Sequence, residues 1–304
     1  MIDREGGRSA AVYADFDQAD LDREYSPSSC VPDLGRLLDD YAVAGARARA
    51  TLRARLDLRY GTGPRQLLDF FPAAAVDAPL QVFVHGGYWQ QLDKRDGSFP
   101  ALDLVPAGVA FAAVGYGLAP EHRLDEIVAS VRQSLWWLLE HAAELGFDPT
   151  RVHLAGSSAG AQLVAMALCA DAMPDGRPPA TVFAGATLLS GVYDLEPIRL
   201  SYVNEALGLD SAAAARNSPL RLLPDRLPPL IVARGGNETS EFARQHDAMV
   251  RAARDRGGEV QDLVVAHRNH FDLPFDLGDP GTALGRAVLA RLGSAGAEDE
   301  QRPV

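Results

Sequence analysis

Two patterns of apolar and polar residues occur along the chain: short apolar runs, and segments in which apolar residues recur at helical spacing. From about residue 56 onward, near-continuous apolar runs of strand length alternate with these longer helical patterns. Such runs are typical of strands that are buried on both faces of a parallel sheet. The predicted strands are Leu67–Phe71, Leu80–His85, Val109–Tyr116, Val152–Gly156, Ala184–Ser190, Leu230–Arg234 and Val260–Ala266.

Helical spacing of apolar residues occurs in the segments between these strands. The predicted helices are Asp125–Leu145, Ala159–Ala172, Ser240–Arg256 and Thr282–Leu292. Alternation of strands and helices predicts an α/β fold with a mostly parallel sheet and helices on both of its faces.

Two regions depart from this alternation. An Ala- and Arg-rich pattern over Val31–Arg55 predicts a long helix, within an N-terminal helical extension of about residues 20–55. Residues 192–227 are irregular and proline-containing, with a short helical piece near Ser211–Arg216. An insertion that follows a strand's carboxyl end lies over the functional edge of an α/β sheet, so we expect a small cap there. No repeat or linker divides the chain, which predicts one domain over residues 1–304.

The composition and charge of the chain indicate which partners and which location to expect. With 47% hydrophobic residues the chain can build a sizeable core, and its net charge of −12 argues against nucleic acid or an anionic membrane as partner. No apolar stretch reaches the roughly 18 residues that suggest a membrane span. The first residues, Met1–Glu5, are charged and show no signal peptide, so a cytoplasmic protein is expected. The polar tail Ser294–Val304 is expected to be frayed.

A candidate nucleophile lies in Gly156-Ser157-Ser158-Ala159-Gly160, directly after a predicted strand and before a predicted helix. The G-x-S-x-G pattern in this context predicts a tight turn that holds the serine hydroxyl at a helix N-terminus. Ser158 fits and Ser157 does not, because only Ser158 has glycine two positions away on both sides. The alternative interpretation is a turn of small residues without chemistry.

A serine nucleophile needs a base and an acid that orients the base. The strand Leu230–Arg234 ends in a glycine-containing loop that presents Glu238, while Glu241 and Asp262 remain alternative acids. After the last strand, His270 lies further into its loop than His267 and is the preferred base. The order Ser, acid, His is that of the α/β-hydrolase arrangement.

An oxyanion site is predicted upstream, where a buried strand runs into His85-Gly86-Gly87-Tyr88-Trp89. Backbone N–H groups after the glycines can turn toward a bound carbonyl, together with the N–H of Ala159. His85 is interpreted as holding this loop by hydrogen bonds. Tyr88 and Trp89 are either core aromatics or an apolar wall for a planar substrate.

Taken together, these segments give the chain a pattern that resembles the kynurenine formamidase (arylformamidase) branch of the α/β-hydrolases, close to hormone-sensitive-lipase-like esterases. The resemblance covers about residues 20–292 and rests on His-Gly-Gly-Tyr-Trp at 85–89, Gly-Ser-Ser-Ala-Gly at 156–160, Glu-Thr-Ser-Glu-Phe at 238–242 and Asn-His-Phe-Asp at 269–272. It implies an α/β-hydrolase fold, with Ser158 as nucleophile, Glu238 as acid and His270 as base. It also implies oxyanion donors at Gly87 and Tyr88. The family's acid is often Asp, and Glu238 departs from that pattern.

The favoured hypothesis is a serine hydrolase that cleaves an N-formyl arylamine, such as N-formylkynurenine, through a formyl-serine intermediate. A carboxylesterase for small or aryl esters is the alternative, and a non-catalytic binding protein on a hydrolase fold is a third. A substrate carboxylate would need a cation, for which Arg123 and Arg199 are candidates, although both fit a surface position. A small-molecule substrate is the expected partner and a homodimer is left open. No cofactor or metal is implied, because Gly115-Tyr116-Gly117 lacks the third glycine of a dinucleotide fingerprint and no histidine pair has metal spacing.

Overall fold

One sheet forms the centre of the computed structural model, which describes residues 10–293. Within these residues the sheet has eight strands in the order β1-β2-β4-β3-β5-β6-β7-β8. The strands are β1 (Arg55–Arg59), β2 (Leu67–Phe71), β3 (Ala78–Val84), β4 (Ala110–Val114), β5 (Phe147–Ser157), β6 (Gly185–Leu189), β7 (Leu230–Asn237) and β8 (Val260–Asn269). β2 pairs antiparallel with β1 and β4, whereas all later pairings are parallel, so the prediction of a mostly parallel sheet is confirmed.

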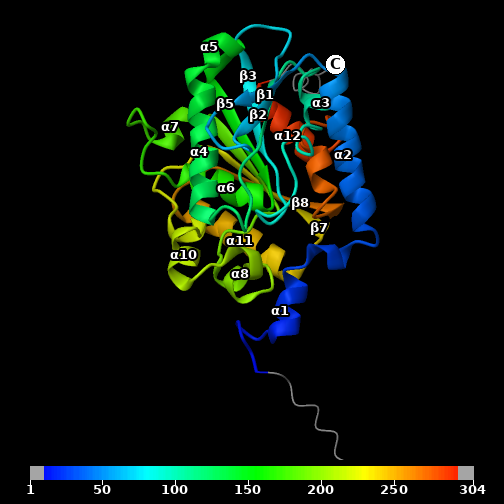
Figure 1. Cartoon of the computed structure of the whole chain (residues 1–304), viewed down its shortest axis with the longest axis vertical. Helices are drawn as coiled ribbons and strands as arrows, with labels where there is room; N and C mark the ends of the chain where they lie inside the picture. The colour runs from blue at the N-terminus through cyan, green and yellow to red at the C-terminus, as the bar shows by residue number, and fades with distance from the viewer. Residues whose placement is uncertain (1–9, 294–304) are drawn as a thin grey trace, which may run out of the picture.

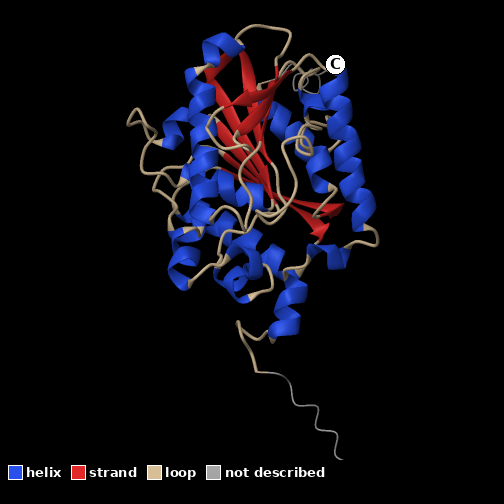
Figure 2. Cartoon of the chain, viewed as in Figure 1, coloured by secondary structure: helices blue, strands red, loops and turns tan. Residues whose placement is uncertain are grey.

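Helices cover both faces of this sheet, as Figure 2 shows. The helices are α1 (Gln18–Glu24), α2 (Leu34–Thr51), α3 (Ala101–Leu104), α4 (Leu124–Glu140), α5 (Ala142–Leu145), α6 (Ala159–Leu168), α7 (Pro179–Val182), α8 (Glu196–Leu200), α9 (Asn204–Leu207), α10 (Ser211–Arg216), α11 (Ser240–Asp255) and α12 (Ala283–Leu292). α4, α6 and α11 contribute to one hydrophobic cluster, and α2, α3 and α12 to the other. The two clusters put helices on opposite sides of the sheet (Figure 1).

The edge strand β1 is absent from the sequence prediction, which places a helix as far as residue 55. The helix α2 ends at Thr51, and the chain then pairs antiparallel with β2. Most side chains of β1 are exposed, so its sequence Arg-Leu-Asp-Leu-Arg lacks the apolar run that reveals a buried strand. The predicted helix Asp125–Leu145 is likewise two helices, which are separated at His141.

The N-terminal extension consists of α1, a 3₁₀ turn η1 at Pro27–Cys30, and α2, which is the long helix predicted over Val31–Arg55 with shorter bounds. The predicted cap region, residues 192–227, contains α8, α9, α10 and the 3₁₀ turn η2 at Pro219–Arg221. Helix α1 lies beside α8 at one end of the sheet, whereas α2 runs along the side of the molecule (Figure 1). Gln18 Nε2 donates to the Leu200 carbonyl at 2.9 Å and the Tyr202 N–H to Asp22 Oδ1 at 2.8 Å.

No helix within residues 10–293 combines the length and the apolar character that a membrane span needs. The predictions for Met1–Glu5 and Ser294–Val304 fall outside the described residues.

Candidate active site

Ser158 occupies a strained turn between β5 and α6. Its backbone has φ 55° and ψ −118°, a conformation that is costly for a residue with a side chain and is typical of a nucleophile held out of a strand-to-helix turn. A Cβ atom on Gly160 would lie 2.0 Å from the Val84 carbonyl oxygen, so the helix can approach β3 only with glycine there. The Ser158 N–H donates to the Leu189 carbonyl at 2.7 Å, which fixes the turn against β6.

His270 and Glu238 meet at the carboxyl edge of the sheet. Nδ1 of His270 lies 3.1 Å from Oε2 of Glu238, and their side chains are 5% and 0% exposed. The imidazole packs edge-on against Phe242 at 4.5 Å and against Phe271 at 5.2 Å between ring centroids. His270 and Ser158 line the same cavity, although no hydrogen bond joins their side chains in the described structure. Hydrogen bonds between catalytic groups often tighten only when substrate is bound.

The second carboxylate oxygen of Glu238 is held by two further donors. Oε1 accepts from the Ser190 hydroxyl at 2.6 Å and from the Gly235 N–H at 2.6 Å. With His270, three hydrogen-bond donors therefore orient this buried side chain. Sequence reasoning missed the role of Ser190, whose only signal is a hydroxyl directly after a buried strand.

Replacing Ser190 with alanine should lower kcat/KM about tenfold, since Glu238 loses a hydrogen bond to a charged oxygen while keeping the one from Gly235. Steady-state rates of both proteins across a range of pH measure this effect. Ser190→Cys, which keeps an unbranched side chain with a weak donor at this buried position of positive φ, is the matched variant and should recover part of the loss. An unchanged rate in Ser190→Ala would show that this contact does not position Glu238.

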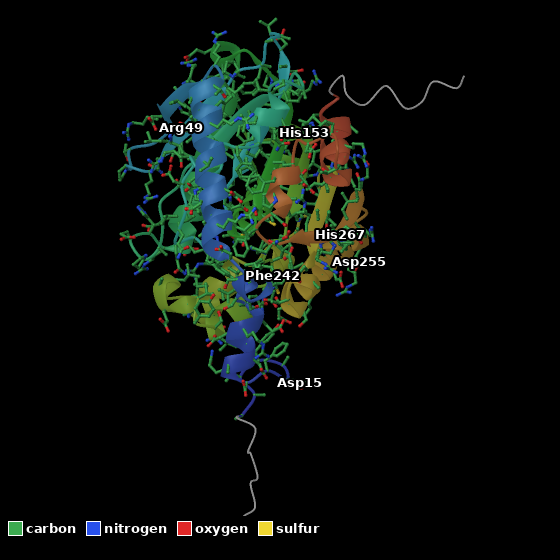
Figure 3. The ribbon with its side chains drawn as sticks, turned by 90° about the vertical axis from the view of Figure 1, so that its right-hand side faces the viewer. Asp15, Arg49, His153, Phe242, Asp255 and His267 are labelled. Atoms are coloured by element: carbon green, nitrogen blue, oxygen red, sulfur yellow. The ribbon has the colours of Figure 1, made fainter. Side chains whose placement is uncertain are left out.

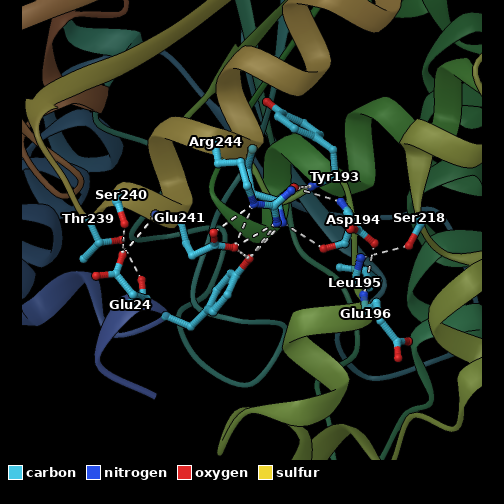
Figure 4. Close-up of polar contacts among 12 residues, drawn as sticks. Glu24, Tyr193, Asp194, Leu195, Glu196, Ser218, Thr239, Ser240, Glu241 and Arg244 are labelled. Carbon is cyan, nitrogen blue, oxygen red and sulfur yellow. Dashed lines mark hydrogen bonds and ion pairs between the residues drawn. The ribbon is translucent and has the colours of Figure 1, made fainter. Parts of the chain in front are cut away.

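The alternative acid Glu241 is engaged elsewhere. Its carboxylate accepts from the Tyr25 hydroxyl at 2.7 Å and pairs with Arg244 at 2.8 Å. Figure 4 shows these contacts in a network that also ties Glu24 to Ser240, at 2.7 Å between Oε2 and Oγ. Glu241 therefore joins the N-terminal helix α1 to α11, and it does not contact His270.

Asp262 and His267, the remaining candidates for the acid and the base, lie on the edge strand β8. Asp262 Oδ1 lies 2.8 Å from Nε2 of His246, a helix residue of α11. His267 is exposed on the outer edge of the sheet (Figure 3). Neither residue lines the cavity that Ser158 and His270 share.

The predicted oxyanion loop has an unusual backbone. Gly87 has φ +100°, which strongly favours glycine, and Tyr88 has φ 50°. Gly86, Gly87 and Tyr88 all line the cavity beside Ser158. Within residues 10–293, the backbone N–H groups of Gly87, Tyr88 and Ala159 donate no hydrogen bond to a protein acceptor. These amides are thus available for a developing oxyanion.

Of the two interpretations of Trp89, a core aromatic or part of an apolar substrate wall, the structure supports the first and contradicts its assignment to the substrate site. Its side chain is fully buried, its Nε1 donates to Gln162 Oε1 at 3.0 Å, and it does not line the cavity. Tyr88 does line the cavity, and its hydroxyl donates to the Tyr25 carbonyl at 2.6 Å.

His85 is buried beneath the oxyanion loop. Its ring stacks on Tyr116 at 4.2 Å between centroids and its Nδ1 lies 2.9 Å from the Gly86 carbonyl. Burial lowers the pKa of His85 to about 4, so the neutral imidazole is retained at neutral pH. These contacts fit the predicted role of holding the loop.

A cavity of about 230 Å³ opens at Ser158. Its walls come from the loop after β3 through Gly87 and Tyr88, from the predicted cap region through Tyr202 and Val203, and from α2 through Leu34 and Tyr41. The contribution of the extension was not predicted. Among residues 10–293 no lysine or arginine lines this cavity, and the predicted cations Arg123 and Arg199 lie outside it.

The described residues offer no cluster of three or more His, Cys, Asp or Glu side chains that could hold a metal ion. At the cavity, the structure brings together a hydroxyl on a strained turn, an imidazole beside a carboxylate, and backbone amides without a protein acceptor.

Comparison with known proteins adds independent findings. A family model described as an α/β-hydrolase fold matches residues 81–271. The kynurenine formamidase of Salmo salar is 32% identical over 93% of this chain and 99% of its own length. Esterase LipQ of Mycobacterium tuberculosis is 29% identical over 78% of this chain and 64% of its own length. A solved structure from Silicibacter sp., provisionally assigned as a thioesterase, has 31% identity and a TM-score of 0.77 over 89% of this chain and 99% of its own.

Proposed function

The chain belongs to the α/β-hydrolase family, in its kynurenine formamidase branch, and on that premise we propose that Ser158, His270 and Glu238 are its catalytic triad. The protein is a hydrolase, which stands against the non-catalytic interpretation. The proposed reaction is hydrolysis of an N-formyl arylamine. The contact between Glu238 and His270, at the edge of the cavity that Ser158 lines, carries this proposal.

In the proposed mechanism, the Ser158 hydroxyl oxygen attacks the formyl carbon while Nε2 of His270 takes the hydroxyl proton. The carbonyl oxygen becomes an oxyanion that accepts hydrogen bonds from the N–H groups of Gly87, Tyr88 and Ala159. Collapse of this intermediate breaks the carbon–nitrogen bond, and His270 returns its proton to the departing arylamine. Water, deprotonated by His270, then attacks the formyl-serine and releases formate.

A small acyl group is consistent with the proposed oxyanion site. A formyl group has no side chain, so only its carbonyl has to be held by the proposed oxyanion loop. The aryl part would occupy the wider cavity of about 230 Å³, where Tyr88 and Leu34 provide apolar surface. Ester hydrolysis passes through the same tetrahedral oxyanion and is the second candidate, favoured by the similarity to esterase LipQ.

Turnover of matched substrates decides between these reactions. We expect kcat/KM for N-formylkynurenine to exceed that for p-nitrophenyl acetate, because the branch to which the chain belongs includes kynurenine formamidases. Formate release measures the first reaction and nitrophenolate absorbance the second. Rapid ester turnover without formate release would assign the protein to the esterases.

The proposal also covers the organisation of the chain: a single hydrolase domain, an N-terminal extension at about 20–55 and a cap at about 192–227. A cytoplasmic location and a homodimer stay predictions. Light scattering of the purified protein measures its mass in solution and tests the dimer.

A further inference from the structure

Asp96 is a carboxylate in the cavity wall that forms no ion pair within residues 10–293. Its Oδ2 accepts from the Asp93 N–H at 2.9 Å. Oδ1 makes no hydrogen bond within residues 10–293, and no described Lys, Arg or His forms an ion pair with this side chain. Because neither lysine nor arginine lines the cavity, Asp96 places an unbalanced negative charge in it.

The two cations nearest to Asp96 in the sequence are already paired. Lys94 Nζ lies 2.6 Å from both Asp57 Oδ1 and Asp69 Oδ1, and its side chain is buried. Arg95 donates from Nε to Asp93 Oδ1 at 3.0 Å and is exposed. The turn thus directs its positive charges away from the cavity and its one free carboxylate into the cavity wall.

The turn that carries Asp96 is fixed on two sides. Its Asp96 N–H donates to the Asp93 carbonyl at 3.0 Å, which closes the turn. Helix α2 lies so close to it that a Cβ atom on Gly45 would fall 2.0 Å from the Arg95 carbonyl oxygen. On the other side Gly97 lies against Phe83, at the end of the strand that leads into the oxyanion loop. Asp96 therefore keeps a constant position relative to the reacting groups.

Half-burial makes this charge unfavourable in the free protein. Loss of solvation raises the pKa of Asp96, and the neighbouring charge of Asp93 raises it further, whereas the backbone hydrogen bond and Arg95 lower it only in part. A cation brought into the cavity would stabilise the ionised form, and a second anion would be repelled.

We propose that Asp96 binds an ammonium group of the substrate and so selects amino-substituted aryl substrates over acidic ones. This inference rests on the proposed function for the reaction at Ser158. A substrate that carries both an ammonium and a carboxylate would place the ammonium at Asp96, and its carboxylate would remain toward solvent. Asp96 would then determine specificity without acting on the reacting atoms.

Three formanilides with a meta substituent test the proposal: aminomethyl, which is cationic at neutral pH, ethyl, which is neutral and similar in size, and carboxylate. The corresponding three aryl acetates form a parallel ester series. We expect wild-type kcat/KM to fall in the order aminomethyl, ethyl, carboxylate. The order should hold in both series, because Asp96 interacts with the substituent and not with the bond that is cleaved.

Asp96→Asn removes the charge but keeps an acceptor for the Asp93 N–H. It should lower kcat/KM for the aminomethyl compounds about tenfold, leave the ethyl compounds within about twofold and raise the carboxylates. Asp103→Asn, which removes an exposed carboxylate on α3 outside the cavity, is the matched control and should leave the order unchanged.

If Asp96→Asn lowers kcat/KM equally for all three substituents, Asp96 has a structural role and the proposal is overturned. The proposal is also overturned if kcat/KM does not change for any of them. If the formanilides are not cleaved while the acetates show the expected order, the formamidase function fails and the role of Asp96 stands. If the formanilides are cleaved at similar rates whatever their substituent, the formamidase function stands and the proposed role of Asp96 fails.

Discussion

Replacing Ser158 with alanine is expected to lower kcat/KM by about 10⁴-fold or more, because the proposed acyl-enzyme can no longer form. The residual rate would come from the oxyanion amides and the binding cavity alone, which act without the nucleophile. A fluorophosphonate probe that labels active serines measures the same loss covalently. The wild type should bind one probe molecule per protein chain, and Ser158→Ala should not be labelled.

Ser157→Ala is the matched control for this experiment, since it removes the adjacent hydroxyl and leaves the turn at Ser158 in place. That variant should keep the covalent label. Thermal unfolding of both variants shows whether the fold is retained. Labelling that survives in Ser158→Ala and disappears in Ser157→Ala would mean that the wrong serine of the pair has been assigned.

Strands of the parallel sheet were predictable because burial on both faces leaves an unbroken apolar run. β6 was predicted at Ala184–Ser190 and spans Gly185–Leu189, and all five of its residues are buried. The edge strand β1 could not be found in the same way. Four of its five residues are exposed, so the strand has no apolar run. Its pairing with β2 depends on contacts between separate segments, which the local pattern of apolar residues does not indicate.

The aromatic pair that follows Gly86 and Gly87 marks a limit of what can be predicted from the sequence. Tyr88 and Trp89 are adjacent, both aromatic and both at positive φ, yet one lines the cavity and the other is fully buried against Gln162. Which ring faces substrate depends on the turn geometry of this loop. A motif fixes the residue types there but not the direction of each side chain.

The walls of the cavity were only partly predictable, for a related reason. The irregular composition of residues 192–227 indicated a cap, and Tyr202 and Val203 do line the cavity. Leu34 and Tyr41 reach it from a helix far upstream in the sequence, which is placed there by tertiary contacts such as the hydrogen bond from the Tyr41 hydroxyl to the Phe271 carbonyl. The unpaired carboxylate of Asp96 is equally invisible in sequence, where it is one charge among several.

Glu238→Gln is expected to lower kcat by about 10⁴-fold, the scale on which an oriented histidine loses its function when its carboxylate becomes an amide. Glutamine retains an oxygen that can accept from Ser190 and Gly235, so the loop geometry should persist. What is lost is the negative charge beside Nδ1 of His270, which stabilises the imidazolium and selects the tautomer with a free Nε2.

Two other carboxylates, Glu241 and Asp262, provide control variants for this prediction. Glu241→Gln breaks the contacts of Glu241 with Tyr25 and Arg244, and Asp262→Asn those of Asp262 with His246. We expect both to change thermal stability more than kcat, since neither carboxylate contacts His270. Steady-state kcat and melting temperature, measured on all three variants, separate the two effects. A loss of kcat in Glu241→Gln or Asp262→Asn as large as that in Glu238→Gln would transfer the acid role away from Glu238, because only the carboxylate that orients His270 can lower the chemical step without unfolding the protein.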